Sequence, residues 1–209
     1  MFCGIEFGSC YVYSPRGACP LSERSRHART FLKSGDSAFL RRYAQIVKSR
    51  VNGGCAIARL FDDNPILVPV PGAVQRGPDS PWVAERLCLA LLRQGLGRSI
   101  WAGLRRINAV QKSGTAPRDQ RPSTWTHYHS FAVDAPPVGM DRMLLVDDIV
   151  TKGRTLLAAA TRIQETCPDA RICAFAFVRT MGLVADIDRL VDPCVGEIHW
   201  RGGDAQRIP

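Results

Sequence analysis

Two adjacent carboxylates lie in a segment whose residue types are suited to binding or converting a ligand. Asp147 and Asp148 follow the apolar run "MLLV" and precede the polar turn "TKGRT" at residues 151–155. Carboxylate oxygens accept hydrogen bonds from a diol. A turn that leads into a helix offers free N–H groups and partial positive charge to a phosphate. The pattern therefore predicts a site for a sugar phosphate with free adjacent hydroxyls.

The turn supplies groups that suit a phosphate. Gly153 allows close approach of the backbone, Thr151 and Thr155 add hydroxyls, and Lys152 and Arg154 add positive charge. The alternative is that the two aspartates only cap the following helix. Six residues separate the second aspartate from the expected start of that helix, whereas a capping aspartate lies directly before the first turn. Capping alone is therefore disfavoured.

The elements that must position these groups are predicted from hydrophobic patterning, because near-continuous apolar runs are typical of buried strands and 3.6-residue spacing of helices. Strands are expected within residues 64–72, 142–148, 170–180 and 191–200, and helices over 34–51, 80–97 and 154–167. Asp36 or Ser34 is the expected N-cap of the first helix, and Ser80 with Pro81 begins the second. The order predicts an α/β fold with a mostly parallel sheet flanked by helices. Ligands of such sheets bind outside the carboxyl ends of the strands, where the acidic pair is expected.

Two segments lack periodic patterning. Residues 1–30 are rich in Gly, Ser, Cys and Arg and are expected to form an irregular N-terminal segment before a main domain at 31–209. Cys3, Cys10 and Cys19 form no C-x-x-C pair, so a degenerate zinc-finger remnant is one interpretation and metal binding there is left open. Residues 106–130 are polar and basic, and a loop of this length is usually functional or mobile.

The whole chain suits a globular protein with anionic ligands. Its 209 residues are 45% apolar and 22% charged, which is enough to bury a core. The net charge of +9 favours a phosphorylated small molecule, nucleic acid or both. No apolar run approaches the roughly 20 residues that cross a bilayer, and the first residues lack the pattern of a signal peptide. We therefore expect a cytoplasmic protein.

The segment "LLVDDIVTKGRT" resembles the phosphoribosyl pyrophosphate (PRPP) binding motif of type I phosphoribosyltransferases. "FLKSGD" and "ILVPVP", with their spacing to "LLVDD", are similar to the ComF-like branch, and the resemblance covers roughly residues 28–180. It implies a type I phosphoribosyltransferase fold with a mobile hood loop. It also implies Mg²⁺-dependent transfer of the phosphoribosyl group from PRPP to an acceptor, with release of pyrophosphate. The acceptor is left open.

Carried over to this sequence, the resemblance implies that Asp147 and Asp148 are catalytic, contact the ribose 2′ and 3′ hydroxyls, and hold Mg²⁺ through water. The implied 5′-phosphate loop is Thr151, Lys152, Gly153, Arg154 and Thr155, and the implied pyrophosphate loop is Pro71, Gly72, Ala73 and Val74. The segment 106–130 would be the mobile loop, in which Lys112, Arg118 or Arg121 reaches the pyrophosphate.

The sequence departs from the family pattern in three places. The paired C-x-x-C of the branch is missing. After "VPVP" the family shows a basic run and R-G-F-N-Q, where this chain reads "GAVQRGPDSP" with only Arg76 and Gly77 in common. The purine-salvage members carry an Asp where this chain has Thr151. A simple hypoxanthine or guanine salvage role is therefore disfavoured.

Two alternatives to an enzyme are a catalytically weak PRPP sensor and a nucleic-acid-binding protein, because the ComF-like branch is related to DNA-uptake (competence) factors. Trp125, His127 and Tyr128 lie in the basic segment and could stack on bases. The opposing interpretation is that Trp125 and Tyr128 pack the segment onto the body of the protein. A further alternative is a homodimer or larger assembly in which the N-terminal segment docks a partner.

Overall fold

A central seven-stranded sheet organises the described part of the chain, in the order β3-β2-β6-β7-β1-β8-β9. The computed structural model describes residues 3–74, 82–112, 117, 120–137, 139–182 and 184–209. The strands are β1 (Gly4–Tyr13), β2 (Ile66–Pro69), β3 (Ser99–Ile100), β4 (Leu104–Arg106), β5 (Phe131–Val133), β6 (Arg142–Val150), β7 (Arg171–Thr180), β8 (Val191–Arg201) and β9 (Asp204–Ile208). The helices are α1 (Pro20–Ser34), α2 (Ser37–Asn52), the 3₁₀ helix η1 (Ala56–Leu60), α3 (Val83–Leu92), α4 (Thr124–His129) and α5 (Arg154–Thr166).

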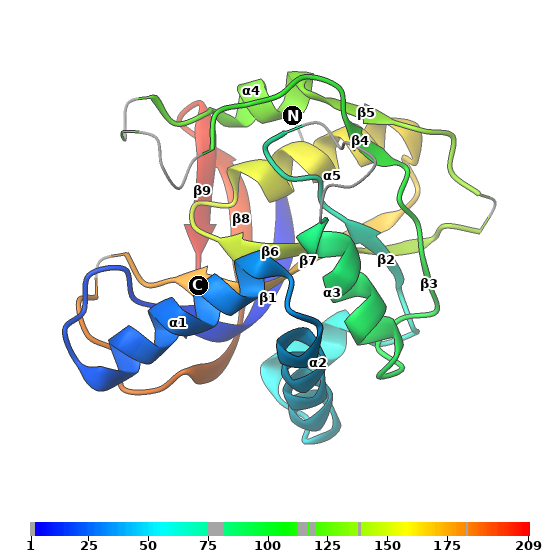
Figure 1. Cartoon of the computed structure of the whole chain (residues 1–209). Helices are drawn as coiled ribbons and strands as arrows, with labels where there is room; N and C mark the ends of the chain where they lie inside the picture. Colours follow the sequence, from blue (N-terminus) through cyan, green and yellow to red (C-terminus); the bar gives the residue numbers. More distant parts are fainter. Residues whose placement is uncertain (1–2, 75–81, 113–116, 118–119, 138, 183) are drawn as a thin grey trace.

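The sheet is mixed but largely parallel. Strands β3, β2, β6, β7 and β1 run parallel to their neighbours, whereas β8 is antiparallel to β1 and β9 is antiparallel to β8. Helices cover both faces: α1, α2 and α3 lie on one side, and α5 lies on the other together with α4, β4 and β5 (Figure 1). The prediction of an α/β fold with a mostly parallel sheet flanked by helices is confirmed.

The apolar run before the acidic pair is buried on both faces of the sheet. Successive side chains of a strand point to opposite faces. Met143 and Leu145 therefore join one core with α5, whereas Leu144 and Val146 join a second core with α2 and α3. Burial on both faces explains why the strand is a continuous apolar run rather than an alternating one.

The expectation of an irregular segment at residues 1–30 is wrong for most of its length. Residues 4–13 form β1, which lies between β7 and β8 inside the sheet, and residues 20–34 form α1. The small residues of β1 allow close packing against η1, because a Cβ at Gly8 would lie 2.4 Å from Leu60 Cδ1. The small residues that suggest a loop in the sequence are therefore required by tertiary packing.

Several predicted elements are found, with some shifts at their ends. Asp36 caps α2 through its Oδ1, which accepts the Phe39 N–H at 2.7 Å. The third helix begins at Val83, and the expected start residues Ser80 and Pro81 lie outside the described residues. Strands β2, β6 and β7 and helix α5 are confirmed, and β8 is longer than a short strand.

The described part of residues 106–130 contains a short helix, α4, and is flanked by the strands β4 and β5. We define the hood as β4, α4 and β5; β4 and β5 form a small antiparallel sheet of their own. Helix α4 begins after Ser123, whose Oγ accepts the Thr126 N–H at 3.1 Å. Among the described helices, none is both long enough and apolar enough to cross a membrane.

Candidate functional site

The carboxyl ends of β2 and β6 bring the predicted site residues together. These strands are parallel neighbours with Pro69 opposite Val146, and the Val70 N–H donates to the Val146 carbonyl at 2.9 Å. The chain continues from β2 into residues 71–74 and from β6 into the turn at 151–153. The loop, the acidic pair and the turn therefore share one edge of the sheet, which is the usual ligand edge of such folds.

The acidic pair still belongs to β6, because that strand continues to Val150 with Ile149 opposite Val178. Adjacent residues of a strand point to opposite faces. Asp148 therefore faces α1, where one of its carboxylate oxygens forms an ion pair with Lys33 Nζ. Asp147 points to the hood side, and its Oδ1 accepts the N–H of Asp148 at 2.8 Å. The two carboxylates approach the strand end from its two faces.

The electrostatics of the pair explain how two adjacent acids coexist. Burial, and after it repulsion from Asp148, raises the pKa of Asp147 above its usual value, whereas Lys33 lowers it. Carboxyl oxygens accept hydrogen bonds from a diol, so the pair offers acceptors on both faces of the strand end.

Gly153 fixes the shape of the turn. Its φ is +84°, in the left-handed region that favours glycine. A Cβ there would lie 2.6 Å from the Ile198 side chain. The Gly153 carbonyl accepts the Leu157 N–H at 2.9 Å, which starts α5. The first N–H groups of a helix have no partner within it, so the turn has the geometry of an anion site at the carboxyl end of β6.

The side chains of the turn have different environments. Arg154 Nε donates to both carboxylate oxygens of Asp204, at 2.9 and 2.8 Å, and Arg154 Nη1 donates to the Pro122 carbonyl at 3.0 Å. Its guanidinium thus joins the turn to β9 and to the segment before α4. Lys152 is exposed, with Nζ 3.9 Å from Asp204 Oδ2. The Arg154 side chain therefore connects the start of α5 to β9 and to the segment before α4.

The two threonines connect the turn to its surroundings. Thr151 Oγ1 lies 3.0 Å from Thr180 Oγ1 at the end of β7, and Thr155 Oγ1 lies 3.4 Å from His127 Nε2 in α4. These contacts connect the turn to β7 and to the hood.

Arg106 is the central contact of the hood with the 71–74 loop, and sequence reasoning missed it. This buried side chain donates through Nε to the Gly72 carbonyl, through Nη2 to the Pro71 carbonyl at 3.3 Å, and through Nη1 to Ser130 Oγ. Its guanidinium lies 4.2 Å from the centre of the Phe131 ring. Burial lowers the pKa of Arg106 to about 10, and Asp147 opposes that shift, so the guanidinium stays charged at neutral pH.

A backbone contact reinforces this connection, since the Val110 N–H donates to the Ala73 carbonyl at 2.8 Å. Of the four residues of the 71–74 loop, Pro71 is buried, while Gly72 and Val74 are exposed. The sequence offered one clue to Arg106, an arginine near apolar residues, but nothing in it identified the carbonyl groups that receive its N–H donors.

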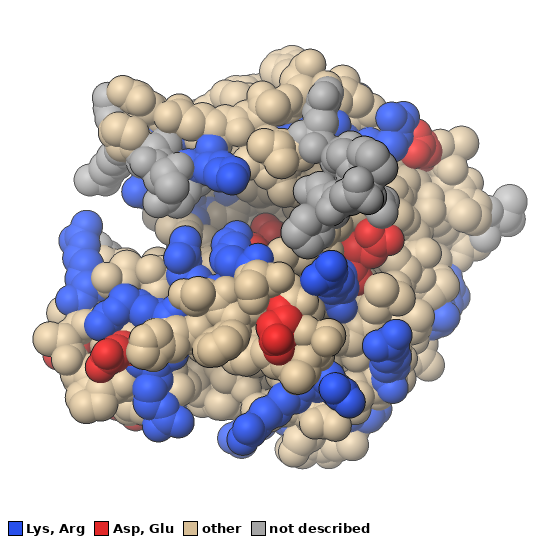
Figure 2. Space-filling model, in the orientation of Figure 1, with Lys and Arg blue, Asp and Glu red and all other residues tan. Residues whose placement is uncertain are grey.

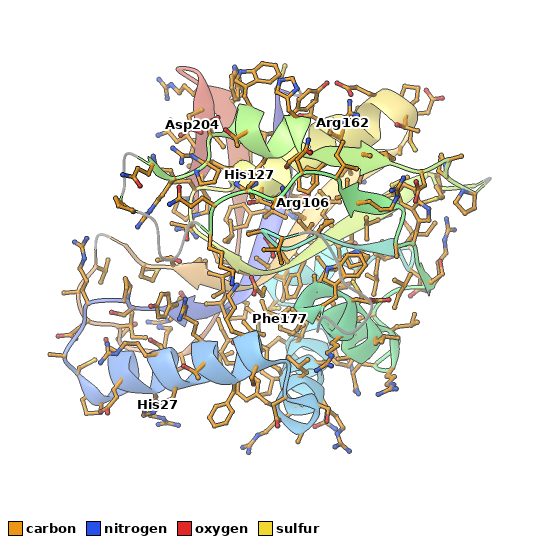
Figure 3. The ribbon with its side chains drawn as sticks, turned by 45° about the horizontal axis from the view of Figure 1, so that its top comes forward. His27, Arg106, His127, Arg162, Phe177 and Asp204 are labelled. Carbon is orange, nitrogen blue, oxygen red and sulfur yellow. The ribbon has the colours of Figure 1, made fainter. Side chains whose placement is uncertain are left out.

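His127 lies inside the hood and not on its surface. It is buried, and its Nδ1 has no hydrogen-bond partner among the described residues. Burial first, then the charges of Arg106 and Arg154, lower the pKa of His127 to about 4. Figure 3 shows His127 on the same side of the sheet as Arg106 and Asp204, while His27 points away on α1. The imidazole is therefore neutral at pH 7 and does not act as a stacking surface.

The other hood aromatics differ in exposure. Tyr128 packs on α5, where its hydroxyl donates to Glu165 Oε1 at 2.7 Å. Trp125 is 42% exposed and contacts Trp200 and Tyr128 with ring centres 5.6 and 5.3 Å apart. Packing of the segment onto the body thus applies to Tyr128 and, through Trp200 of β8, to part of the Trp125 ring, the rest of which is accessible.

Basic side chains surround the site. Figure 2 shows Lys and Arg gathered around a hollow between the hood and α1. Of the mobile-loop candidates, Lys112 and Arg121 are exposed on the hood side, and Arg118 lies outside the described residues. The Arg121 carbonyl accepts Arg154 Nη1 at 3.4 Å, which places the Arg121 backbone close to the turn.

The acidic pair supplies only part of the ligand set that a divalent cation needs. Mg²⁺ usually binds through one or two carboxylates plus substrate phosphates and waters. One oxygen of Asp148 faces Lys33, and Oδ1 of Asp147 accepts a backbone N–H. No cluster of three or more His, Cys, Asp or Glu side chains suited to a metal occurs in the described ranges. Asp147 and Asp148 therefore offer two carboxylates whose remaining oxygens could contact a cation.

The three N-terminal cysteines lie in separate environments. Cys3 is exposed, Cys10 is in the core with its pKa raised to about 12 by burial, and Cys19 caps α1, its Sγ accepting the Ser22 N–H at 3.4 Å. The three cysteines are therefore exposed, buried in the core and at a helix N-terminus, respectively.

Comparisons with protein families and with curated proteins found no relative of this chain. No protein-family model matches the chain, and no curated protein sequence matches it.

Proposed function

We propose that the chain is a phosphoribosyltransferase, which binds PRPP with Mg²⁺ and transfers the phosphoribosyl group to an acceptor, with release of pyrophosphate. The observation that carries the proposal is the meeting of three groups at one sheet edge: the acidic pair, the turn at the start of α5 and the 71–74 loop. The described fold would then be that of the type I phosphoribosyltransferases, with β4, α4 and β5 as its hood.

Each part of PRPP has a complementary group in this arrangement. Asp147 and Asp148 would bind the ribose 2′ and 3′ hydroxyls from the two faces of β6. The N–H groups and hydroxyls of residues 151–155 would bind the 5′-phosphate. The backbone of residues 71–74 would bind the pyrophosphate, with Lys112, Arg118 or Arg121 supplying positive charge from the hood side.

The chemical step would be a displacement at the anomeric carbon. The bond from that carbon to the pyrophosphate oxygen breaks, its electron pair leaves with pyrophosphate, and the acceptor forms the new bond and loses its proton. Groups that stabilise the charge of the leaving group lower the barrier. Mg²⁺, held by ligand oxygens and through water by Asp147 and Asp148, would supply part of that charge when bound. Arg106 would act as a positioning residue, because it holds the 71–74 loop against the hood.

The first test is PRPP binding, measured by isothermal titration calorimetry in Mg²⁺. The variant Asp147→Asn with Asp148→Asn should lose measurable binding while keeping the fold, as judged by circular dichroism. The matched control is Asp62→Asn with Asp63→Asn, a second pair of adjacent, exposed aspartates before the amino end of β2. Wild-type affinity in the first double variant would exclude the proposed ribose site.

A second assay separates an enzyme from a sensor. Pyrophosphate release from PRPP is followed with and without candidate bases and other nucleophiles. Release that requires an acceptor supports transfer, whereas PRPP binding with no turnover on any acceptor supports a sensing role.

Nucleic-acid binding is a second candidate function, favoured by the exposed ring of Trp125 and, separately, by the basic side chains around the hollow. Aromatic rings stack on unpaired bases, and cations contact phosphates. Binding of a single-stranded oligonucleotide should then weaken steeply with salt, and Trp125→Ala should weaken it further. No binding at low salt would remove this candidate.

A further inference from the structure

A lysine from α1 contacts the acidic pair. Lys33 Nζ forms an ion pair with Oδ2 of Asp148. The side chain of Asp148 is only 13% exposed, whereas that of Lys33 is 47% exposed. The ammonium therefore reaches a largely buried carboxylate from the open side of the site, and it remains accessible to a ligand.

The position of Lys33 is fixed by the anchoring of α1. Lys33 lies in the last turn of α1, where the helix dipole favours a positive charge. Helix α1 ends at Gly35, whose N–H donates to the Leu32 carbonyl at 3.1 Å, and the Gly35 carbonyl accepts Arg86 Nη1 from α3 at 3.1 Å. The end of the helix that carries Lys33 is thus attached to a second helix.

Two more basic residues lie along the same side of α1. Arg26 Nη1 donates to the Gly17 carbonyl at 2.7 Å, and the Arg29 guanidinium lies 5.6 Å from the centre of the Tyr13 ring. Spacing of three and seven residues from Arg26 places Arg29 and Lys33 on one helix face. Arg26 thus contacts the segment after β1, and Arg29 contacts the last residue of β1. These contacts hold this face of α1 at the carboxyl end of the sheet.

The ammonium occupies one of the two Asp148 oxygens that a metal ion could use, Oδ2. A divalent cation binds carboxylate oxygens directly or through one water. An ammonium group and a divalent cation repel each other and compete for the same oxygen. A cation that binds Oδ2 of Asp148 must therefore move Lys33, whereas a ligand can bind with Lys33 in place and use its charge.

We propose that Lys33 is the resident cation of the acidic pair and takes the place of a divalent cation at Asp148 when a phosphoribosyl ligand binds. The inference rests on the proposed function and changes one part of it: Lys33 replaces the water-mediated contact of Asp148 with Mg²⁺, and that of Asp147 is kept. Ligand affinity at Asp148 then depends little on Mg²⁺, and Mg²⁺ contributes mainly by binding the pyrophosphate group. Lys33 acts as a binding and positioning residue.

The test compares PRPP affinity in EDTA with that in saturating Mg²⁺, by isothermal titration calorimetry on the full chain. Wild-type affinity should differ by less than about tenfold between the two media, because Lys33 supplies the local charge. Lys33→Met should lose about tenfold or more in EDTA and clearly less in Mg²⁺. Lys33→Arg should retain most of the EDTA affinity because it keeps the charge. Lys48→Met on α2 is the control for the change in net charge.

A second readout needs no ligand. Mn²⁺ binding to the free protein, followed by the loss of its free-ion electron paramagnetic resonance signal, should tighten about fivefold or more in Lys33→Met, because competition for the carboxylate is removed. Lys33→Arg and Lys48→Met should leave Mn²⁺ binding as in the wild type.

The outcomes separate this inference from the proposed function. PRPP binding that requires Mg²⁺ in the wild type, or that responds to Lys33→Met as it does to Lys48→Met, overturns the role of Lys33 and leaves the phosphoribosyl site intact. Failure of the wild type to bind PRPP in either medium overturns the proposed function, and the inference with it.

Discussion

The acidic end of β6 and the hood meet at the same edge of the sheet, but the residues that form each of them differ in how far apart they are in the sequence. Asp147 and Asp148, the turn at 151–155 and the start of α5 follow one another directly in the sequence. The hood is held by residues far apart in sequence, such as Arg106 with Gly72 and Thr124 with Asp204. One half of the site is therefore encoded locally, and the other depends on tertiary contacts.

This difference predicts where substitutions act. Changes in the turn should affect ligand binding through local backbone geometry. Changes at the hood contacts should first affect stability and the position of the 71–74 loop. The following variants test that division.

Arg106→Met should have the largest effect on stability. It leaves the Gly72 and Pro71 carbonyls and Ser130 Oγ without this donor, and losing hydrogen bonds from a buried charged group costs about 3 kcal/mol. Chemical denaturation measures the loss. The neighbouring Arg105, which pairs with Asp134 on the surface, provides the control, and Arg105→Met should change the unfolding free energy far less. Equal effects of the two variants would contradict the anchoring role of Arg106.

The stability of the hood should depend on pH through His127. Its folded-state pKa of about 4 lies below the unfolded value of 6.5, so the unfolded state binds more protons between these values. The contribution of His127 to the unfolding free energy should therefore fall as the pH drops from about 6.5 to about 4, by about 2–3 kcal/mol. The raised pKa of Asp147 contributes with the opposite sign, so the comparison with a His127 variant isolates the histidine. Above pH 6.5 the contribution of His127 is constant.

His127→Phe should remove this contribution, so its profile, measured by denaturation at several pH values, should have a different slope from that of the wild type between about pH 6.5 and 4. His27→Gln, at an exposed histidine of α1, should leave the slope unchanged. If His127→Phe kept the slope, the titration would belong to another group.

Gly153→Ala should disturb the turn. The alanine must adopt a positive φ and place its Cβ against Ile198, which together costs about 2 kcal/mol. PRPP binding should weaken as well, because the N–H groups of the turn shift. Gly54→Ala, at a positive-φ glycine with open space around it, provides the control for backbone strain alone. Loss of stability without any loss of binding would place the phosphate site elsewhere.

Asp204→Asn should have the smallest effect of the four. It removes the charge that pairs with Arg154 and keeps an acceptor for Thr124, so the expected cost is about 1 kcal/mol. Thermal denaturation measures this cost, and Asp188→Asn on the surface is the control. A larger loss than that of Arg106→Met would make Asp204, and not Arg106, the main contact of the hood.

The same division explains how much could be predicted from the sequence. The apolar runs of β2, β6 and β7 and the periodic pattern of α5 are local, and they were predicted correctly. The pairing of Ile149 with Val178 extends β6 past the acidic pair, so the opposite orientations of Asp147 and Asp148 could not be inferred from residue types. The ion pair with Lys33 needs α1, which the sequence did not indicate as a helix.

The N-terminal strand was missed for a physical reason. Gly8 and Ser9 are poor strand formers by composition, but both are buried between neighbouring strands and η1. Tertiary context overrides such local preferences. In the hood, α4 has six residues, too few for periodicity to stand out, and its position depends on Arg106, Arg154 and Asp204.

The place of β1 in the sheet has a consequence for biosynthesis. Its neighbours β7 and β8 begin more than 150 residues later, at Arg171 and Val191. A growing chain on the ribosome therefore carries β1 with both edges unpaired until nearly all of the sheet has been translated. Contacts between such distant segments slow folding, and unpaired strand edges favour aggregation. Among the strands of the sheet, β1 is thus the one whose exposure a chaperone would have most reason to limit.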